Sequence, residues 1–234
     1  MEGTELLYLD RNTAKIRERI ANAARAAGRK EDSVLMLAAV KYAEPEEIDR
    51  LVHELGVTDI GENRVQQLLE HCERVDLNGV NIHFIGTLQT NKVKYIIDKV
   101  TLIHSLDSLK LAAEIDKQAK KHGRVMDVLV EINSGEEESK SGLAPSEVEA
   151  FCAELSAFEN IRLCGFMTMA PRCEDRSEYL KYFGQTYAQV LDIWTEKLHN
   201  IGKPIVSMGM SESFEEAIAC GSDIVRIGRS LFVK

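Results

Sequence analysis

Short apolar runs alternate with longer amphipathic segments along almost the whole chain. The runs have the length of strands, and the segments between them repeat apolar residues at helical spacing. We therefore predict eight strands, at Val34–Val40, Asp59–Gly61, Asn81–Ile85, Leu102–His104, Met126–Ile132, Ile161–Met167, Pro204–Ser207 and Ile224–Ile227. Between them we predict helices at Pro45–Leu55, Arg64–Val75, Asn91–Lys99, Ser108–His122, Pro145–Ser156, Ser177–His199 and Ser213–Cys220. One more helix, Thr13–Ala27, is expected ahead of the first strand, with Asn12 as its N-cap.

The strand pattern predicts a parallel sheet. Runs such as VLMLAAV and DVLVEI are continuously apolar, as strands covered on both faces are. Eight strands with seven intervening helices indicate a closed (β/α)8 barrel of the TIM type with an extra N-terminal helix, formed by residues 1–234 as a single domain. A doubly wound open sheet is the alternative, but the Gly-rich turn typical of dinucleotide-binding sheets is missing after the first strand.

The net charge, the cysteine spacing and the lack of a long apolar stretch limit the kinds of partner and cellular compartment that we expect. The net charge of −9 argues against broad binding of nucleic acid or anionic membranes. The five cysteines form no Cys-x-x-Cys pair, so neither a disulfide framework nor a metal site is indicated. No signal peptide and no apolar stretch of about 20 residues is visible, and we therefore expect a cytoplasmic protein.

A lysine stands at the end of the first predicted strand. Barrels of this type place their active face at the carboxyl ends of the strands, and Lys41 directly follows LMLAAV. A lysine there can simply extend its amine to water. The functional interpretation is a desolvated amine, whose neutral form condenses with an aldehyde. Position alone leaves both readings open.

The segments after strands seven and eight resemble a phosphate site. Such loops often bind phosphate in these barrels, and here they read SMGMSES and RIGRS. Gly209 and Gly228 allow close approach of a ligand, and the Ser211 hydroxyl precedes a predicted helix. Ser211 could equally cap that helix, with Glu215 at capping-box-like spacing. Arg226 lies in an apolar strand and needs a partner, either a carboxylate or the ring nitrogen of a bound pyridine.

These features together fit pyridoxal 5′-phosphate (PLP). PLP carries an aldehyde for the amine, a phosphate for the two loops and a pyridine ring for the arginine. A sugar-phosphate aldolase that forms a Schiff base on a lysine would use two of the three features.

At these residues the chain resembles the pyridoxal phosphate homeostasis protein family, single-domain relatives of the alanine racemase barrel. The resemblance covers nearly the whole chain. It is carried by LAAVK ending at Lys41, IGENRVQ (60–66), HFIGTLQTNK (83–92), IHSLDS (103–108), KSGL (140–143), GFMTMAP (165–171), SMGMS (207–211) and VRIGRSLF (225–232).

The resemblance implies roles for eight residues. Lys41 matches the lysine that holds PLP as a Schiff base, and Arg226 matches the residue that faces the pyridine nitrogen. The remaining positions are the phosphate-site residues Ser211, Gly228 and Arg229, the last through its backbone, and the pocket-lining residues Asn63, Met208 and Gly209. His83 is more simply a satisfied core histidine. Lys140 could touch the phosphate transiently, but it is more simply a solvated lysine.

The arginine also bears on activity. PLP catalysis works best when the pyridine nitrogen is protonated, and a facing arginine disfavours that cation. The second domain that supplies a tyrosine base in two-domain racemases has no counterpart before the end of this chain. The resemblance therefore implies a binding protein, not an enzyme. Its expected roles are intracellular PLP homeostasis, amino-acid and keto-acid balance, and the buffering of PLP or its supply to apo-enzymes. We expect the protein to be a monomer. A weak PLP-dependent amino-acid racemase is the alternative.

Overall fold

The computed structural model describes residues 6–135, 141–197 and 203–234, and these form a closed barrel of eight parallel strands. Each strand pairs with the next, and β8 pairs with β1 to close the ring, which rules out the open sheet. The strands are β1 Leu35–Ala39, β2 Asp59–Glu62, β3 Asn81–Phe84, β4 Leu102–Leu106, β5 Met126–Ile132, β6 Ile161–Thr168, β7 Ile205–Met210 and β8 Ile224–Ile227. The predicted TIM-type barrel is confirmed, with all eight strands at the expected places.

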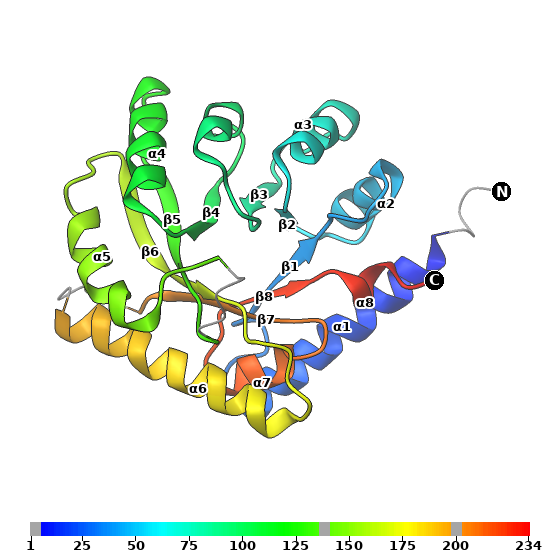
Figure 1. Ribbon diagram of the computed structural model, residues 1–234. Coiled ribbons are helices and arrows are strands. Elements are labelled where there is room, and N and C mark those ends of the chain that lie inside the picture. Colours follow the sequence, from blue (N-terminus) through cyan, green and yellow to red (C-terminus); the bar gives the residue numbers. More distant parts are fainter. Residues whose placement is uncertain (1–5, 136–140, 198–202) are drawn as a thin grey trace.

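Helices surround the barrel (Figure 1). The α-helices are α1 Leu7–Ala26, α2 Pro45–Asp49, α3 Val65–Arg74, α4 Leu109–Lys121, α5 Val148–Leu155, α6 Arg176–Asp192, α7 Phe214–Ala219 and α8 Arg229–Phe232. Single π-helical turns extend two of them, at Arg50–Glu54 after α2 and at Ile193–Lys197 after α6, and a 3₁₀ turn Pro145–Glu147 precedes α5. The predicted helix end at His199 lies outside the described residues. No helix in the described ranges is both long and apolar enough to cross a membrane.

Two predicted helices differ from the structure. α1 begins at Leu7, so Asn12 lies within the helix and caps nothing. The Asn12 amide instead donates to the Leu231 and Val233 carbonyls at 3.0 and 2.8 Å, which fixes α1 against the end of the chain. Between β3 and β4 the chain forms a 3₁₀ helix, Thr90–Tyr95, in place of the predicted helix Asn91–Lys99.

The apolar core has two layers. The larger layer lies between the strands and the helices. A second cluster receives no residue from any helix, so it fills the barrel itself. Its buried members are Leu37, Ala39, Ile85, Leu102, Leu129, Met167 and Ile224. Because side chains alternate along a strand, every second residue of these strands faces the same interior.

Candidate functional site

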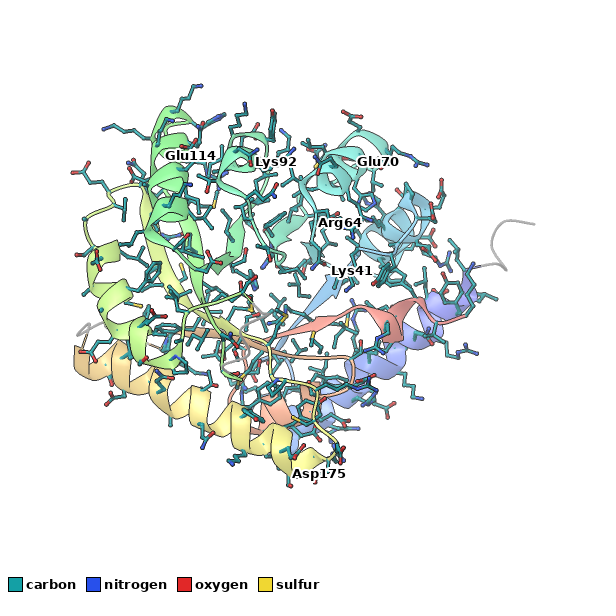
Figure 2. The ribbon with its side chains drawn as sticks, in the orientation of Figure 1. Lys41, Arg64, Glu70, Lys92, Glu114 and Asp175 are labelled. Carbon is teal, nitrogen blue, oxygen red and sulfur yellow. The ribbon has the colours of Figure 1, made fainter. Side chains whose placement is uncertain are left out.

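Lys41 lies just beyond the barrel interior. Leu37 and Ala39 belong to the interior cluster and β1 ends at Ala39, so Lys41 continues the same alternation at the carboxyl end of the strand (Figure 2). Its backbone carbonyl accepts a hydrogen bond from Gln67 Nε2 at 2.9 Å, which anchors this position to α3. The side chain is exposed, with Nζ 4.8 Å from the centre of the Tyr42 ring. Of the two readings that the sequence left open, the structure shows the amine extended toward water, because the side chain reaches past the last interior layer.

Arg226 is buried at the same end of the barrel. Its Nη1 donates to the carbonyl and the hydroxyl of Ser207, both at 2.8 Å, and its Nη2 donates to the Thr168 carbonyl at 2.9 Å. Burial lowers the pKa of Arg226 to about 10, and the charge of Glu131 acts against that decrease. The guanidinium has five N–H donors, and three are used in these bonds. Two remain for a ligand.

The loops after β7 and β8 meet at two serines. Ser230 donates to the Ser211 hydroxyl from its backbone N–H at 3.4 Å and from its own hydroxyl at 3.1 Å. Ser211 is not the cap of α7, since Ser213 is the N-cap residue. The Arg229 side chain is exposed and pairs with Glu212 at 3.0 Å, so only its backbone faces these serines. Ser230 was missed in the sequence, although it stands beside Arg229 in RIGRS.

Two predicted pocket residues on β7 have packing roles. Gly209 has a φ of +91°, and a Cβ there would lie 2.5 Å from the Cβ of Ala217, so glycine lets α7 pack closely on the strand. Met208 is fully buried in the outer core layer, on the face of β7 opposite Ser207. The Met208 side chain therefore lies away from the barrel interior, because side chains alternate along the strand. Gly228 is half-buried at the start of α8, near Ala39 of β1.

Asn63 contributes an unpartnered polar atom. Among the described residues, four buried side-chain atoms have no hydrogen-bond partner. Asn63 Oδ1 and Ser105 Oγ lie at the ends of β2 and β4, and the other two are Glu62 Oε2 and Thr13 Oγ1. Buried polar atoms are rarely left in this state unless a ligand or water satisfies them. The loop after β3 passes close to the Asn63 backbone at Gly86, where a Cβ would lie 2.2 Å from the Asn63 carbonyl oxygen.

Glu131 is a further acidic group in the interior that the sequence analysis did not single out. It is 3% exposed and lies on the same face of β5 as Leu129. Burial raises the pKa of Glu131 to about 7, with a further contribution from the charge of Asp107, while Arg226 acts in the opposite direction. This carboxyl therefore titrates near neutral pH.

As predicted, His83 is a buried core residue, and both of its ring nitrogens have hydrogen-bond partners. It bonds to Asp59 and His104, both of which are buried. Lys140 lies outside the described residues. No group of three or more potential metal ligands occurs in the part of the chain that the structure describes. A cavity of about 570 Å³, lined in part by Thr58 and Asp223, lies at the opposite end of the barrel and includes none of the candidate residues.

The fold and this site together define a known class of barrel. The family model described as the alanine racemase N-terminal domain matches residues 11–234. A pyridoxal phosphate homeostasis protein of Aquifex aeolicus is 42% identical over 94% of this chain and 95% of its own length. The corresponding proteins of Pseudomonas aeruginosa and Escherichia coli K12 are 36% and 31% identical, each over 94% of this chain and over 93% and 94% of their own lengths. The chain belongs to the pyridoxal phosphate homeostasis protein family.

Solved structures agree with this assignment. A protein of Bifidobacterium adolescentis superposes with a TM-score of 0.87 at 31% identity, over 99% of this chain and 97% of its own. PipY of Synechococcus elongatus, solved with PLP bound, has a TM-score of 0.79 at 28% identity, over 92% of this chain and all of its own. An alanine racemase of Clostridium difficile has a TM-score of 0.74 at 20% identity and is matched over 57% of its length, a likeness of fold.

Proposed function

We propose that this protein holds PLP as a Schiff base on Lys41 and serves in PLP homeostasis, and through it in amino-acid and keto-acid balance. The observation that carries the proposal is the position of Lys41, at the carboxyl end of β1 on the interior side of the barrel that also contains Arg226. A relative of the same fold, PipY, has been solved with PLP bound, and this supports the choice of ligand.

The residues present fit this group. PLP supplies an aldehyde that a lysine amine can attack and a phosphate that hydroxyl and backbone N–H groups can bind. Lys41 offers the amine, and the paired hydroxyls of Ser211 and Ser230, beside Gly228, offer the phosphate contacts. Arg226 keeps two N–H donors for the pyridine nitrogen, and the unpartnered Asn63 oxygen lies at the same end of the barrel.

Arg226 favours storage of the cofactor over turnover. A PLP enzyme withdraws electrons most strongly when its pyridine nitrogen is protonated. A guanidinium facing that nitrogen disfavours the second positive charge. We therefore propose a cofactor-binding protein, not an enzyme, which acts as a monomer in the cytoplasm and buffers PLP or transfers it to apo-enzymes.

Equilibrium dialysis against PLP tests the proposal. We expect the wild-type protein to retain about one PLP per chain and Lys41→Ala to retain little. Lys94→Ala is a matched control, because Lys94 Nζ lies over the ring of Tyr95 at the same 4.8 Å distance that separates Lys41 Nζ from Tyr42. Equal retention by Lys41→Ala and wild type would contradict the proposal.

The weak racemase remains the competing function. Steady conversion of L-alanine to D-alanine by purified wild-type protein, abolished in Lys41→Ala, would favour it. A protein that takes up no PLP at all would instead favour the lysine-based aldolase.

A further inference from the structure

A chain of hydrogen bonds crosses the barrel interior behind Arg226. Arg226 Nη1 donates to Ser207 Oγ at 2.8 Å, and Ser207 Oγ lies 3.1 Å from His104 Nδ1. His104 Nε2 lies 2.9 Å from His83 Nδ1, and His83 Nε2 lies 3.0 Å from Asp59 Oδ1. All five residues are at most 5% exposed. The chain thus joins a cation on β8 to a carboxyl group on β2 through two histidines and a serine.

The two ends and the serine set the direction of every bond. A guanidinium only donates, so Ser207 Oγ is the acceptor for Arg226. The Ser207 hydroxyl must place its own hydrogen on another acceptor, and His104 Nδ1 is the one that its contacts offer. His104 then carries its proton on Nε2 and donates to His83 Nδ1. His83 in turn carries its proton on Nε2 and donates to Asp59.

The surroundings support a neutral His104 in this arrangement. Burial lowers the pKa of His104 well below its ordinary value, and the positive charge of Arg226 acts in the same direction. Burial alone would raise the pKa of Asp59, but hydrogen bonds from His83, Thr58 and Asn81 outweigh it and the pKa is lowered. Asp59 is therefore a carboxylate at neutral pH and accepts the last bond of the chain.

The opposite direction leaves a buried donor unsatisfied. If His83 held a second proton, its Nδ1–H would donate to His104 Nε2, and His104 would then donate from Nδ1 to Ser207. The Ser207 hydroxyl would accept two bonds, and its hydrogen would have no acceptor in a site with no exposure. Folded proteins avoid unsatisfied buried donors.

We propose that His104, supported by His83, is a positioning residue of the cofactor site. By accepting the Ser207 proton it fixes Ser207 Oγ as an acceptor for Arg226. The guanidinium is thereby held in one orientation, and its two remaining N–H groups would be available to a pyridine ring bound there. This inference rests on the proposed function for its ligand, but the protonation of the histidines can be tested without one.

The first test uses the wild-type protein without cofactor. NMR of ¹⁵N-histidine-labelled protein distinguishes a proton on Nδ1 from one on Nε2. From the directions of the hydrogen bonds we expect His83 and His104 each to carry a proton on Nε2 and none on Nδ1. A proton on Nδ1 of His104 would overturn the inference, because Nδ1 could then not accept the hydrogen bond from the Ser207 hydroxyl.

The second test compares the PLP affinity and visible absorption spectrum of four variants. His104→Phe removes the acceptor, and we expect about a tenfold or greater loss of PLP affinity together with a changed spectrum. His104→Asn places an amide oxygen near the position of Nδ1, so we expect it to recover part of both. Ser207→Ala should resemble His104→Phe, and the double variant should lose little more than either single one.

Leu129→Ala is the control for a general loss of packing. Leu129 fills the same barrel interior but makes no contact in the chain of hydrogen bonds, so it should lower stability without changing the spectrum. If both His104→Phe and Ser207→Ala kept the PLP affinity and the spectrum of the wild-type protein, the positioning role of His104 would be refuted. The proposed function would be unaffected by that result. If His104→Phe fails to fold, the same comparison of PLP affinity and spectrum is made with Ser207→Ala and His104→Asn. Failure of the wild-type protein to bind PLP would refute the proposed function itself.

Discussion

At the scale of single residues, Glu131 makes stability depend on pH. The folded state raises the pKa of Glu131 from 4.5 to about 7, so the native protein holds a proton that the unfolded chain releases between those values. The free energy of unfolding therefore contains a contribution that is present below about pH 4.5 and is lost as the pH rises through about 7.

Glu131→Gln removes this titration. We expect the variant to gain roughly 2–3 kcal/mol relative to wild type as the pH rises from 4.5 to 8. Urea unfolding at the two pH values measures the difference. Glu149→Gln, on the exposed face of α5, should show no such change. A constant difference between Glu131→Gln and wild type at both pH values would contradict the assigned pKa.

A second residue-scale prediction concerns Gly86. A methyl group at this position would lie 2.2 Å from the Asn63 carbonyl oxygen, so Gly86→Ala must move the loop after β2 or β3. We expect a loss of about 1–3 kcal/mol in the free energy of unfolding. The control is Gly184→Ala in α6, where a Cβ meets no atom within 4 Å and alanine should gain up to about 1 kcal/mol. Unchanged stability of Gly86→Ala would show that the loop adjusts freely.

At the scale of elements, α1 binds the end of the chain to its beginning. In Figure 1 it runs beside α7 and α8, and the Asn12 amide bonds to two carbonyls near the chain end. We expect Asn12→Ala to lose about 1–2 kcal/mol, because two bonds that hold α1 against the chain end are lost. Thermal unfolding measures the loss. Asn22→Ala, on the exposed face of the same helix, should be near neutral, and an equal loss in both would contradict a specific role for Asn12.

The elements were predictable where periodicity was strong. Leu9, Ile16, Ile20 and Ala24 recur at helical spacing and are buried in α1, yet the start of the helix was placed too late. The sequence suggested an Asn cap, whereas the Asn12 side chain is used by residues more than two hundred positions away. Such a long-range contact has no local signal.

Positions in the candidate site were predictable where residues stand at strand ends. Lys41 and Arg226 follow or end apolar strands, so their unusual chemistry was visible in the sequence. Ser207, His104 and Glu131 lie inside strands, where one polar residue in an apolar run gives little indication of its partner. His104 on β4 and Ser207 on β7 come within hydrogen-bonding distance across the interior only when the barrel closes.

At the scale of the whole molecule, one closed barrel contains both the apolar interior and the candidate site. Lys41, Arg226 and the Ser211–Ser230 pair lie at the carboxyl end of the barrel, beyond its apolar interior layers. Closing the ring therefore brings together residues on or just after β1, β7 and β8. The family assignment agrees with this arrangement, since its relatives include PipY, solved with PLP bound.

The most direct test of the account is to locate the cofactor on the chain. Wild-type protein incubated with PLP is reduced with borohydride, digested and mapped by peptide mass spectrometry, with Lys41→Ala and Lys94→Ala treated in parallel. We expect a pyridoxyl adduct on Lys41 in the wild-type and Lys94→Ala proteins and none in Lys41→Ala. An adduct on a different lysine in the wild-type protein, or no adduct at all, would contradict a Schiff base on Lys41.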